Sequence, residues 1–235
     1  MVWITEKKVI GIIGGMGPLA TADLFQKIIL HTRASCDQEH LRVMIDNNTG
    51  IPDRTAALLS GGPDPTPAMT DSARMLERCG AQLLLIPCNT SHVFYDAVQA
   101  SVGIPVLHMI RITARDLRAR GVTRAGLLAT SGTVRTGIYQ RGFAGMGIDL
   151  LTPEGGGQEA VMDVIYQIKA GNMDFDDAGL RQAVDGLLRQ GAETLILGCT
   201  ELPLMLERHP LDCAVTDPTL ALALEAIRLA GGETV

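Results

Sequence analysis

Short apolar runs alternate with amphipathic stretches along the whole chain. The run at 81–87, AQLLLIP, is almost wholly apolar, as expected of a central parallel strand buried on both faces. Strand-like runs cover residues 8–13, 40–46, 81–87, 104–109, 124–130, 148–153 and 193–198. Helical spacing of apolar residues covers 19–34, 69–78, 93–100, 113–120, 134–141, 158–170, 178–189 and 219–229. This alternation predicts α/β layers built on parallel sheets.

The second half of the chain repeats the first. Residues 80–88 align without a gap with residues 191–199, at an offset of 111, and both segments end on a cysteine. The strands around Gly11 and Gly126 align at an offset of 115, and each is followed by a turn rich in small residues. A period of this length is too long for a solenoid and indicates two similar α/β lobes. Chance resemblance between two helix–strand units is the alternative interpretation.

Composition and charge narrow the classes of function. Hydrophobic residues make up 46% and charged residues 20%, which is ordinary for a globular protein. The net charge of −6, without a basic run, argues against nucleic acid as a partner. The N-terminal run VIGIIGG is too short for a signal peptide or a membrane span, so we expect no membrane partner. The five scattered cysteines fit neither a disulfide framework nor CxxC metal spacing, which favours a cytoplasmic location.

Two cysteines occupy the places where ligands bind in open α/β sheets. Cys88 and Cys199 both follow the carboxyl end of a predicted parallel strand. If the lobes face each other, one thiolate would remove an α-proton from one face of a stereocentre while the other thiol returns a proton to the opposite face. A helix is expected to begin just after each cysteine, and its N-terminal dipole would favour the thiolate. The others are expected to be small buried side chains: Cys36, Cys79 and Cys213.

Polar residues around both cysteines suit a substrate carboxylate. Side-chain donors and early-helix amides follow each cysteine, and the turns after the first strand of each lobe would add further anion-binding amides. Ordinary turn chemistry is the alternative reading of these turns. The candidate binding residues from these segments are Met16, Gly17, Asn89, Thr90, Ser91, Thr130, Thr133, Thr200 and Glu201.

Three motifs resemble those of the aspartate/glutamate racemase family, in its aspartate racemase branch. They are GIIGGMGP at 11–18, IPCNTSH at 86–92 and LGCTELP at 197–203, and the resemblance spans nearly the whole chain. It implies two pseudo-symmetric α/β lobes, each with a mostly parallel four-stranded sheet flanked by helices, and an active site in the cleft between them. It also implies catalytic roles for Cys88 and Cys199, no PLP or metal, and a homodimer.

The resemblance extends to the lobe boundaries and to two cations. Because the C-terminal helix of the family returns to the first lobe, we expect lobes at 1–112 plus 214–235 and at 113–213. Arg54, in IPDRT, and Lys169, in IKAG, match the positions that the family assigns to the substrate's distal carboxylate. An arginine suits bidentate carboxylate recognition, although either residue alone could be an ordinary surface charge.

We therefore predict a cofactor-independent racemase that interconverts the L and D forms of an acidic amino acid, aspartate or glutamate. The enzyme alternatives are a broad-specificity amino-acid racemase, a hydantoin racemase, a maleate isomerase or a decarboxylase. The non-enzyme alternative is a catalytically silent amino-acid-binding protein. Residues 15–20 formally match the GxGxxA dinucleotide fingerprint, but Pro18 lies inside it and no acidic residue ends a strand about 20 positions later. His92, four residues after Cys88, would tune the thiolate, cap a helix or be exposed.

Overall fold

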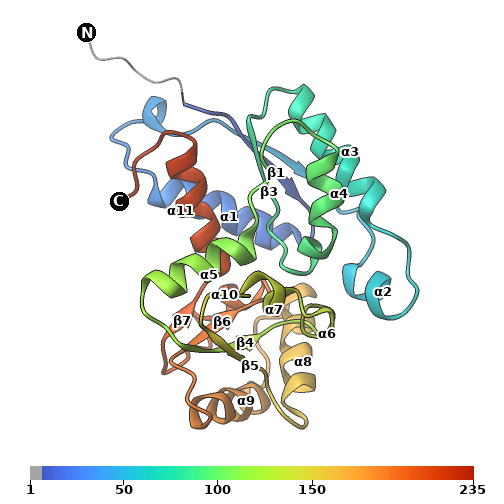
Figure 1. The fold of residues 1–235 in the computed structure, drawn as a ribbon, viewed down its shortest axis with the longest axis vertical. Helices are drawn as coiled ribbons and strands as arrows, with labels where there is room; N and C mark the ends of the chain where they lie inside the picture. The colour runs from blue at the N-terminus through green and yellow to red at the C-terminus, as the bar shows by residue number, and fades with distance from the viewer. Residues whose placement is uncertain (1–6) are drawn as a thin grey trace.

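The computed structural model describes residues 7–235 and contains two α/β lobes (Figure 1). Residues 1–6 lie outside the described residues. They begin the N-terminal segment in which we expect no signal peptide. Within the described part of the chain, no helix combines the length and apolar character that crossing a membrane would take.

The sheet of the first lobe is parallel and has its most buried strand in the middle. β1 (Ile10–Gly14) lies between β2 (Val43–Asn47) and β3 (Leu83–Leu85). Every residue of β1 and β3 is buried, as their apolar runs predict.

The fourth strand that we predicted for this lobe is reduced to a single bridge. Val106 bridges Leu84 in parallel, and the flanking main-chain hydrogen bonds to Pro105 and Leu107 are both 2.8 Å long. Pro105 has no N–H group to extend the ladder, and α5 begins soon afterwards, at Met109. The first lobe therefore has three strands and one bridge instead of four strands.

The second lobe has the predicted four-stranded parallel sheet. Its order is β5-β4-β6-β7, with β4 (Arg124–Leu128) and β6 (Thr194–Leu197) inside and β5 (Asp149–Leu151) at one edge. The other edge is β7 (Val215–Thr216), which pairs with β6 two residues beyond the boundary that we expected at 213.

A glycine occupies the same place in the central strand of each lobe. Gly11 lies opposite Leu84, and a Cβ added to it would come within 2.6 Å of the Leu84 side chain. Gly126 lies opposite Leu195, and an added Cβ would again come within 2.6 Å of that leucine. Both central strands thus need glycine for close packing, at the two positions that the internal repeat aligns.

Each predicted helical segment contains a helix, although the first, at 19–34, is helical only to His31, and two others divide. The segment at 93–100 is split between η2 (Thr90–Phe94) and α4, and the segment at 134–141 is divided at Gly137, which has a left-handed φ of 63°. The helices are α1 (Pro18–His31), α2 (Arg54–Leu59), α3 (Thr66–Arg78), α4 (Tyr95–Ala100), α5 (Met109–Ala119), α6 (Ser131–Thr136), α7 (Ile138–Gly142), α8 (Gly157–Lys169), α9 (Ala178–Arg189), α10 (Leu202–Met205) and α11 (Pro218–Leu229), with η1 at Asp37–Glu39.

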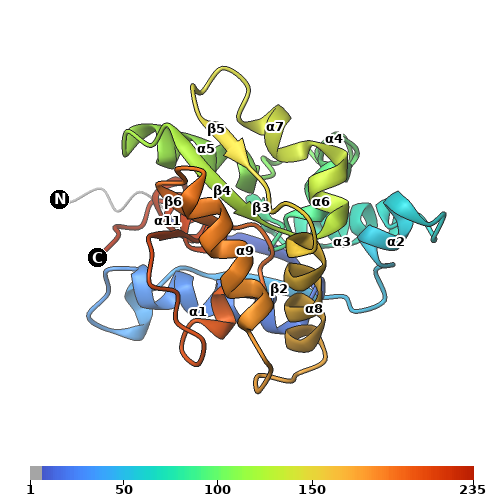
Figure 2. The same ribbon diagram turned by 90° about the horizontal axis from the view of Figure 1, so that it is seen from below.

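Helices cover both faces of each sheet. In the second lobe, α8 and α9 pack on one face, while α5 and α7 pack on the other (Figure 2). In the first lobe, α3 and α4 cover one face, and α1, α5 and α11 cover the other. The C-terminal helix α11 therefore packs against the first lobe (Figure 1).

The cysteines outside the two paired motifs are less buried than we predicted. Cys36 and Cys79 are exposed, and Cys213 is half-buried. Cys36 precedes η1 in a surface loop and Cys79 caps the C-terminal end of α3, so neither side chain reaches a core. All five cysteines are free thiols.

Candidate active site

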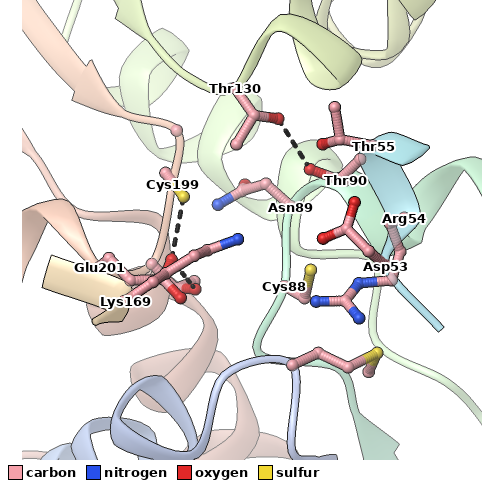
Figure 3. Close-up of a pocket in the computed structure, with 13 residues that line it drawn as sticks. Asp53, Arg54, Thr55, Cys88, Asn89, Thr90, Thr130, Lys169, Cys199 and Glu201 are labelled. Carbon is pink, nitrogen blue, oxygen red and sulfur yellow. Dashed lines mark hydrogen bonds between the residues drawn. The ribbon is translucent and has the colours of Figure 1, made fainter. Parts of the chain in front are cut away.

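A small pocket lies between the two lobes, where strands of both sheets end (Figure 3). The space between its lining side chains, counted together with the open solvent at its mouth, is about 280 Å³. It is lined by Met16, Asp53, Arg54, Thr55, Cys88, Asn89, Thr90, Thr130, Lys169, Gly198, Cys199, Thr200 and Glu201.

The two cysteines of the repeated motif enter this pocket from different lobes. Cys88 follows β3 and Cys199 follows β6, and Figure 3 shows the two thiols on opposite sides of the pocket. Both are buried, with 7% and 6% of their surface exposed. Gly198 allows the end of β6 to pack closely on β4, since a Cβ there would lie 2.6 Å from Leu127.

Burial and the neighbouring Glu201 both favour the protonated form of Cys199. The Cys199 thiol donates a hydrogen bond of 2.9 Å to Glu201 Oε2, and the glutamate is itself buried. Burial, followed by the negative charge of Glu201, raises the pKa of the Cys199 thiol well above its usual range. Our prediction that a helix N-terminus favours the thiolate is wrong for Cys199, because α10 has only one turn and burial outweighs it. Cys199 is therefore held as a thiol, ready to donate a proton.

Three threonine hydroxyls join the lobes beside the cysteines. Thr90 Oγ1 lies 3.0 Å from that of Thr130 and 2.8 Å from that of Thr133, and the latter two are 3.1 Å apart. Thr130 also caps α6 by accepting the N–H of Thr133. Thr90 and Thr130 line the pocket, whereas Thr133 is fully buried behind them.

A buried arginine lies on the Cys88 side of the pocket. Arg54 is the first residue of α2, and the side chain of Asp53 caps that helix by accepting the N–H of Ala56. The Arg54 guanidinium donates through Nη1 to the main-chain oxygens of Ile51 and Pro52, at 3.2 and 2.9 Å. Its Nε is buried and has no protein partner. Arg54 is therefore held in one orientation with an unused donor.

A lysine supplies a second positive charge from the other lobe. Lys169 ends α8 and extends into the pocket near Cys199 (Figure 3). Burial of the ammonium disfavours its charge, but attraction to Cys199 in its thiolate form and to the Glu201 carboxylate outweighs this and raises the pKa of Lys169. Lys169 as a whole residue is exposed, so water weakens these electrostatic effects in part. The ammonium nevertheless stays positively charged.

Three of the predicted binding residues lie behind the pocket. Ser91 is fully buried and donates to the sulfur of Met16, which does line the pocket. Gly17 caps α1, and Thr133 supports the threonine cluster. The sequence reasoning also missed three lining residues: Asp53, Thr55 and Gly198. Each is a chain neighbour of Arg54 or Cys199, and this adjacency was the available signal.

The N-terminus of α1 is unsuited to a dinucleotide. A Cβ on Gly17, the N-cap residue, would lie only 3.2 Å from Glu201 Oε1. The buried Glu201 carboxylate thus lies where a dinucleotide-binding fold would hold the pyrophosphate of its ligand. Because both groups are negatively charged, the carboxylate would repel the pyrophosphate. Among residues 7–235, His, Cys, Asp and Glu side chains form no cluster of three or more that could hold a metal ion.

His92 supports the main chain at Cys88 and does not contact the thiol. Its Nδ1 lies 2.9 Å from the Cys88 carbonyl oxygen, and its Nε2 accepts the N–H of Met109 at 3.0 Å. These partners require the neutral tautomer protonated on Nδ1. Burial lowers the pKa of His92 to about 4.

We expect His92 to make the protein sensitive to acid. The unfolded chain protonates this histidine near pH 6.5, but the folded chain does so only near pH 4, so stability present above pH 6.5 is lost as the pH falls through this range. The free energy of unfolding should fall by about 3 kcal/mol over this range. Urea unfolding at about pH 7 and about pH 4.5 measures it. His92→Gln should show a shallower pH dependence, and His31→Gln is the control; an unchanged slope in His92→Gln would contradict this role.

The fold and the pocket define an enzyme of the two-lobed racemase class. The sequence model of the family described as Asp/Glu/Hydantoin racemase matches residues 13–226. A broad-specificity amino-acid racemase, RacX of Bacillus subtilis, is 28% identical over 93% of this chain and 96% of its own length. The solved structure of Picrophilus torridus aspartate racemase is 31% identical, covers 97% of this chain and 96% of its own, and superposes with a TM-score of 0.85.

An aspartate racemase homologue from Pyrococcus horikoshii is 27% identical, covers 95% of this chain and 99% of its own, and superposes with a TM-score of 0.76. The chain belongs to the Asp/Glu/hydantoin racemase family. It is an amino-acid racemase, as the motifs around its two buried cysteines predicted.

Proposed function

We propose that the enzyme racemises a free acidic amino acid, aspartate or glutamate, by two-base proton transfer and without PLP. The observation that carries this proposal is that Cys88 and Cys199 enter one small pocket from opposite lobes. Two cations, Arg54 and Lys169, line the same pocket and match a substrate with a second carboxylate.

The positions of the side chains suggest how the substrate lies. Both thiols must reach the α-carbon, so the residues next to them, Asn89 and Thr200, contact the groups attached to that carbon. The donor groups of these two residues suit the α-carboxylate. The distal carboxylate then lies against Arg54 and Lys169.

Proton transfer proceeds through a carbanion at the α-carbon. A thiolate of Cys88 takes the α-proton, and the electrons of the broken C–H bond pass into the α-carboxylate as an enediolate. The Cys199 thiol then gives its proton to the opposite face, and the electron pair returns to form the new C–H bond. Cys199 is left as a thiolate, ready for the reverse reaction. The hydrogen bond between the Cys199 thiol and Glu201 supports the starting state of this sequence.

Glu201 has a different role in this scheme from the substrate contact that we expected. Its carboxylate already accepts hydrogen bonds from Cys199 and Thr200. A negative group in that position repels a substrate carboxylate, so Glu201 acts on Cys199 and helps to hold Lys169 in its charged form.

Substrate profiling tests this proposal. The purified enzyme is incubated under reducing conditions and without PLP with L-Asp, L-Glu or L-Ala, and chiral chromatography follows the D forms. We expect kcat/KM for one of the acids to exceed that for alanine by at least about tenfold, since alanine leaves both cations without a carboxylate. No racemisation of either acid would refute the proposal. Equal rates for all three would favour the broad-specificity alternative, which the similarity to RacX supports.

The family resemblance also leads us to propose that the enzyme works as a homodimer in the cytoplasm, on a free amino acid and without nucleic acid. Five free thiols, two of them required for catalysis, suit a reducing compartment. Sedimentation equilibrium of the reduced protein measures the oligomeric state; a mass of one chain at working concentrations would contradict the dimer.

A further inference from the structure

A tyrosine that does not line the pocket is hydrogen-bonded to a residue that does. Tyr139, in α7 of the second lobe, is fully buried. Its hydroxyl donates a hydrogen bond of 2.7 Å to Oδ1 of Asn89, which follows Cys88 in the first lobe. The contact therefore reaches across from one lobe to the other.

This contact leaves the amide nitrogen of Asn89 unused. The side chain is only 2% exposed, and its Nδ2 is a buried donor with no protein partner. Asn89 lines the pocket, so its free NH₂ group is available to a bound molecule there (Figure 3). A buried polar group without a partner is costly, which makes it a strong donor once an acceptor is bound.

The hydroxyl of Tyr139 selects between the two orientations of this amide. An amide rotated by half a turn would direct its oxygen into the pocket and its nitrogen at the tyrosine. The buried hydroxyl proton would then lose Asn89 Oδ1, the one acceptor that it has among residues 7–235. The observed orientation satisfies both groups.

We propose that Tyr139 is a positioning residue that holds the Asn89 amide with its NH₂ group toward the pocket, where it donates to the substrate's α-carboxylate. This inference rests on the proposed function, because it requires an α-carboxylate beside Cys88. Glutamate and aspartate present the same α-carboxylate, so the role of Tyr139 is common to both.

The surroundings of Tyr139 suit this role. Burial and the nearby Cys199 raise the pKa of the phenol well above 10, so the hydroxyl remains a donor throughout the working pH range. Its ring packs beside Phe143, with 5.6 Å between the ring centres. Because the hydroxyl comes from the second lobe and the amide from the first, Asn89 is oriented only when the two lobes are correctly placed.

A double-mutant cycle tests the inference. Tyr139→Phe removes one oxygen atom and should lower kcat/KM for the acidic substrate by about 10- to 100-fold. In the Asn89→Ala background the same substitution should have almost no further effect, because the tyrosine acts through the amide. Tyr95→Phe is the matched control: it removes a 3.0 Å hydrogen bond to the Val106 carbonyl outside the pocket and should retain activity within about twofold.

Two results would overturn the inference: wild-type kcat/KM in Tyr139→Phe, or losses from Tyr139→Phe and Asn89→Ala that simply multiply. Thermal unfolding of each variant shows whether it is folded. If Tyr139→Phe does not fold, Asn89→Asp replaces it, since the carboxylate still accepts from Tyr139 but has no donor for the substrate. A fully active Asn89→Asp would likewise overturn the inference. A wild-type enzyme that racemises neither acid refutes the proposed function itself, whereas an active wild type with an active Tyr139→Phe refutes only the role of Tyr139.

Discussion

Replacing either Cys88 or Cys199 by alanine is expected to lower the racemisation rate in both directions by at least about 10³-fold. Each direction needs one thiolate to take the α-proton and one thiol to supply the new one. Loss of either group therefore stops L-to-D and D-to-L conversion alike, and a positioned acid or base contributes about 10²- to 10⁴-fold. Chiral chromatography from each pure enantiomer measures both rates.

The exposed cysteines provide the control for this experiment. Cys36→Ala and Cys79→Ala remove thiols from the surface and should leave both rates unchanged. Full activity of either Cys88→Ala or Cys199→Ala would show that the two-base mechanism is wrong. Loss of one direction only would indicate that the second proton comes from another donor.

Replacing Arg54 by glutamine is expected to lower kcat/KM for the acidic substrate by about 10²-fold and to leave the rate with alanine nearly unchanged. The buried guanidinium is fixed by two main-chain oxygens and has an unpartnered Nε, so it offers a charged donor at no further cost of ordering. A hydrogen bond to a charged group of this kind is worth about 1.5–3 kcal/mol. Initial rates with aspartate, glutamate and alanine measure the change in specificity.

Arg111→Gln is the matched control, since Arg111 lies over the ring of Tyr95 and does not line the pocket. Arg54→Lys separates charge from shape, because lysine keeps the charge but loses the planar set of donors. Equal losses with alanine and with the acids would show that Arg54 supports the fold of the 51–54 loop instead of recognising a carboxylate.

Much of the fold follows from local patterns in the sequence. β1, β3, β4 and β6 are short apolar runs, and the internal repeat placed a cysteine at the end of one strand in each lobe. The fourth strand of the first lobe was predicted to be longer than the single bridge observed, because its run is as apolar as the others. Pro105 within that run was a sequence signal against a long ladder, whereas the early start of α5 depends on tertiary geometry.

The candidate site was predictable where its residues are neighbours in the chain. The motifs around Cys88 and Cys199 identified six of the thirteen lining residues directly. The direction of a side chain was not predictable: Ser91 turns toward Met16, and Thr133 lies behind Thr90. Contacts between distant residues, such as that of Tyr139 with Asn89, leave no signal in a single sequence.

The pKa of Cys199 shows why residue type alone was insufficient to predict its protonation state. A cysteine before a helix suggested a stabilised thiolate, yet the buried Glu201 two residues later has the opposite effect. Which influence prevails depends on burial and on helix length, and only the folded structure provides both.

Isotope incorporation in D₂O tests the two-base mechanism most directly. L-Asp or L-Glu is incubated with the reduced enzyme without PLP, and mass spectrometry of the separated enantiomers follows deuterium at the α-carbon early in the reaction. Proton transfer between two cysteines on opposite faces predicts that the D product carries deuterium while the remaining L substrate carries almost none. Deuterium entering both enantiomers equally from the start, or no exchange with either acid, would contradict it.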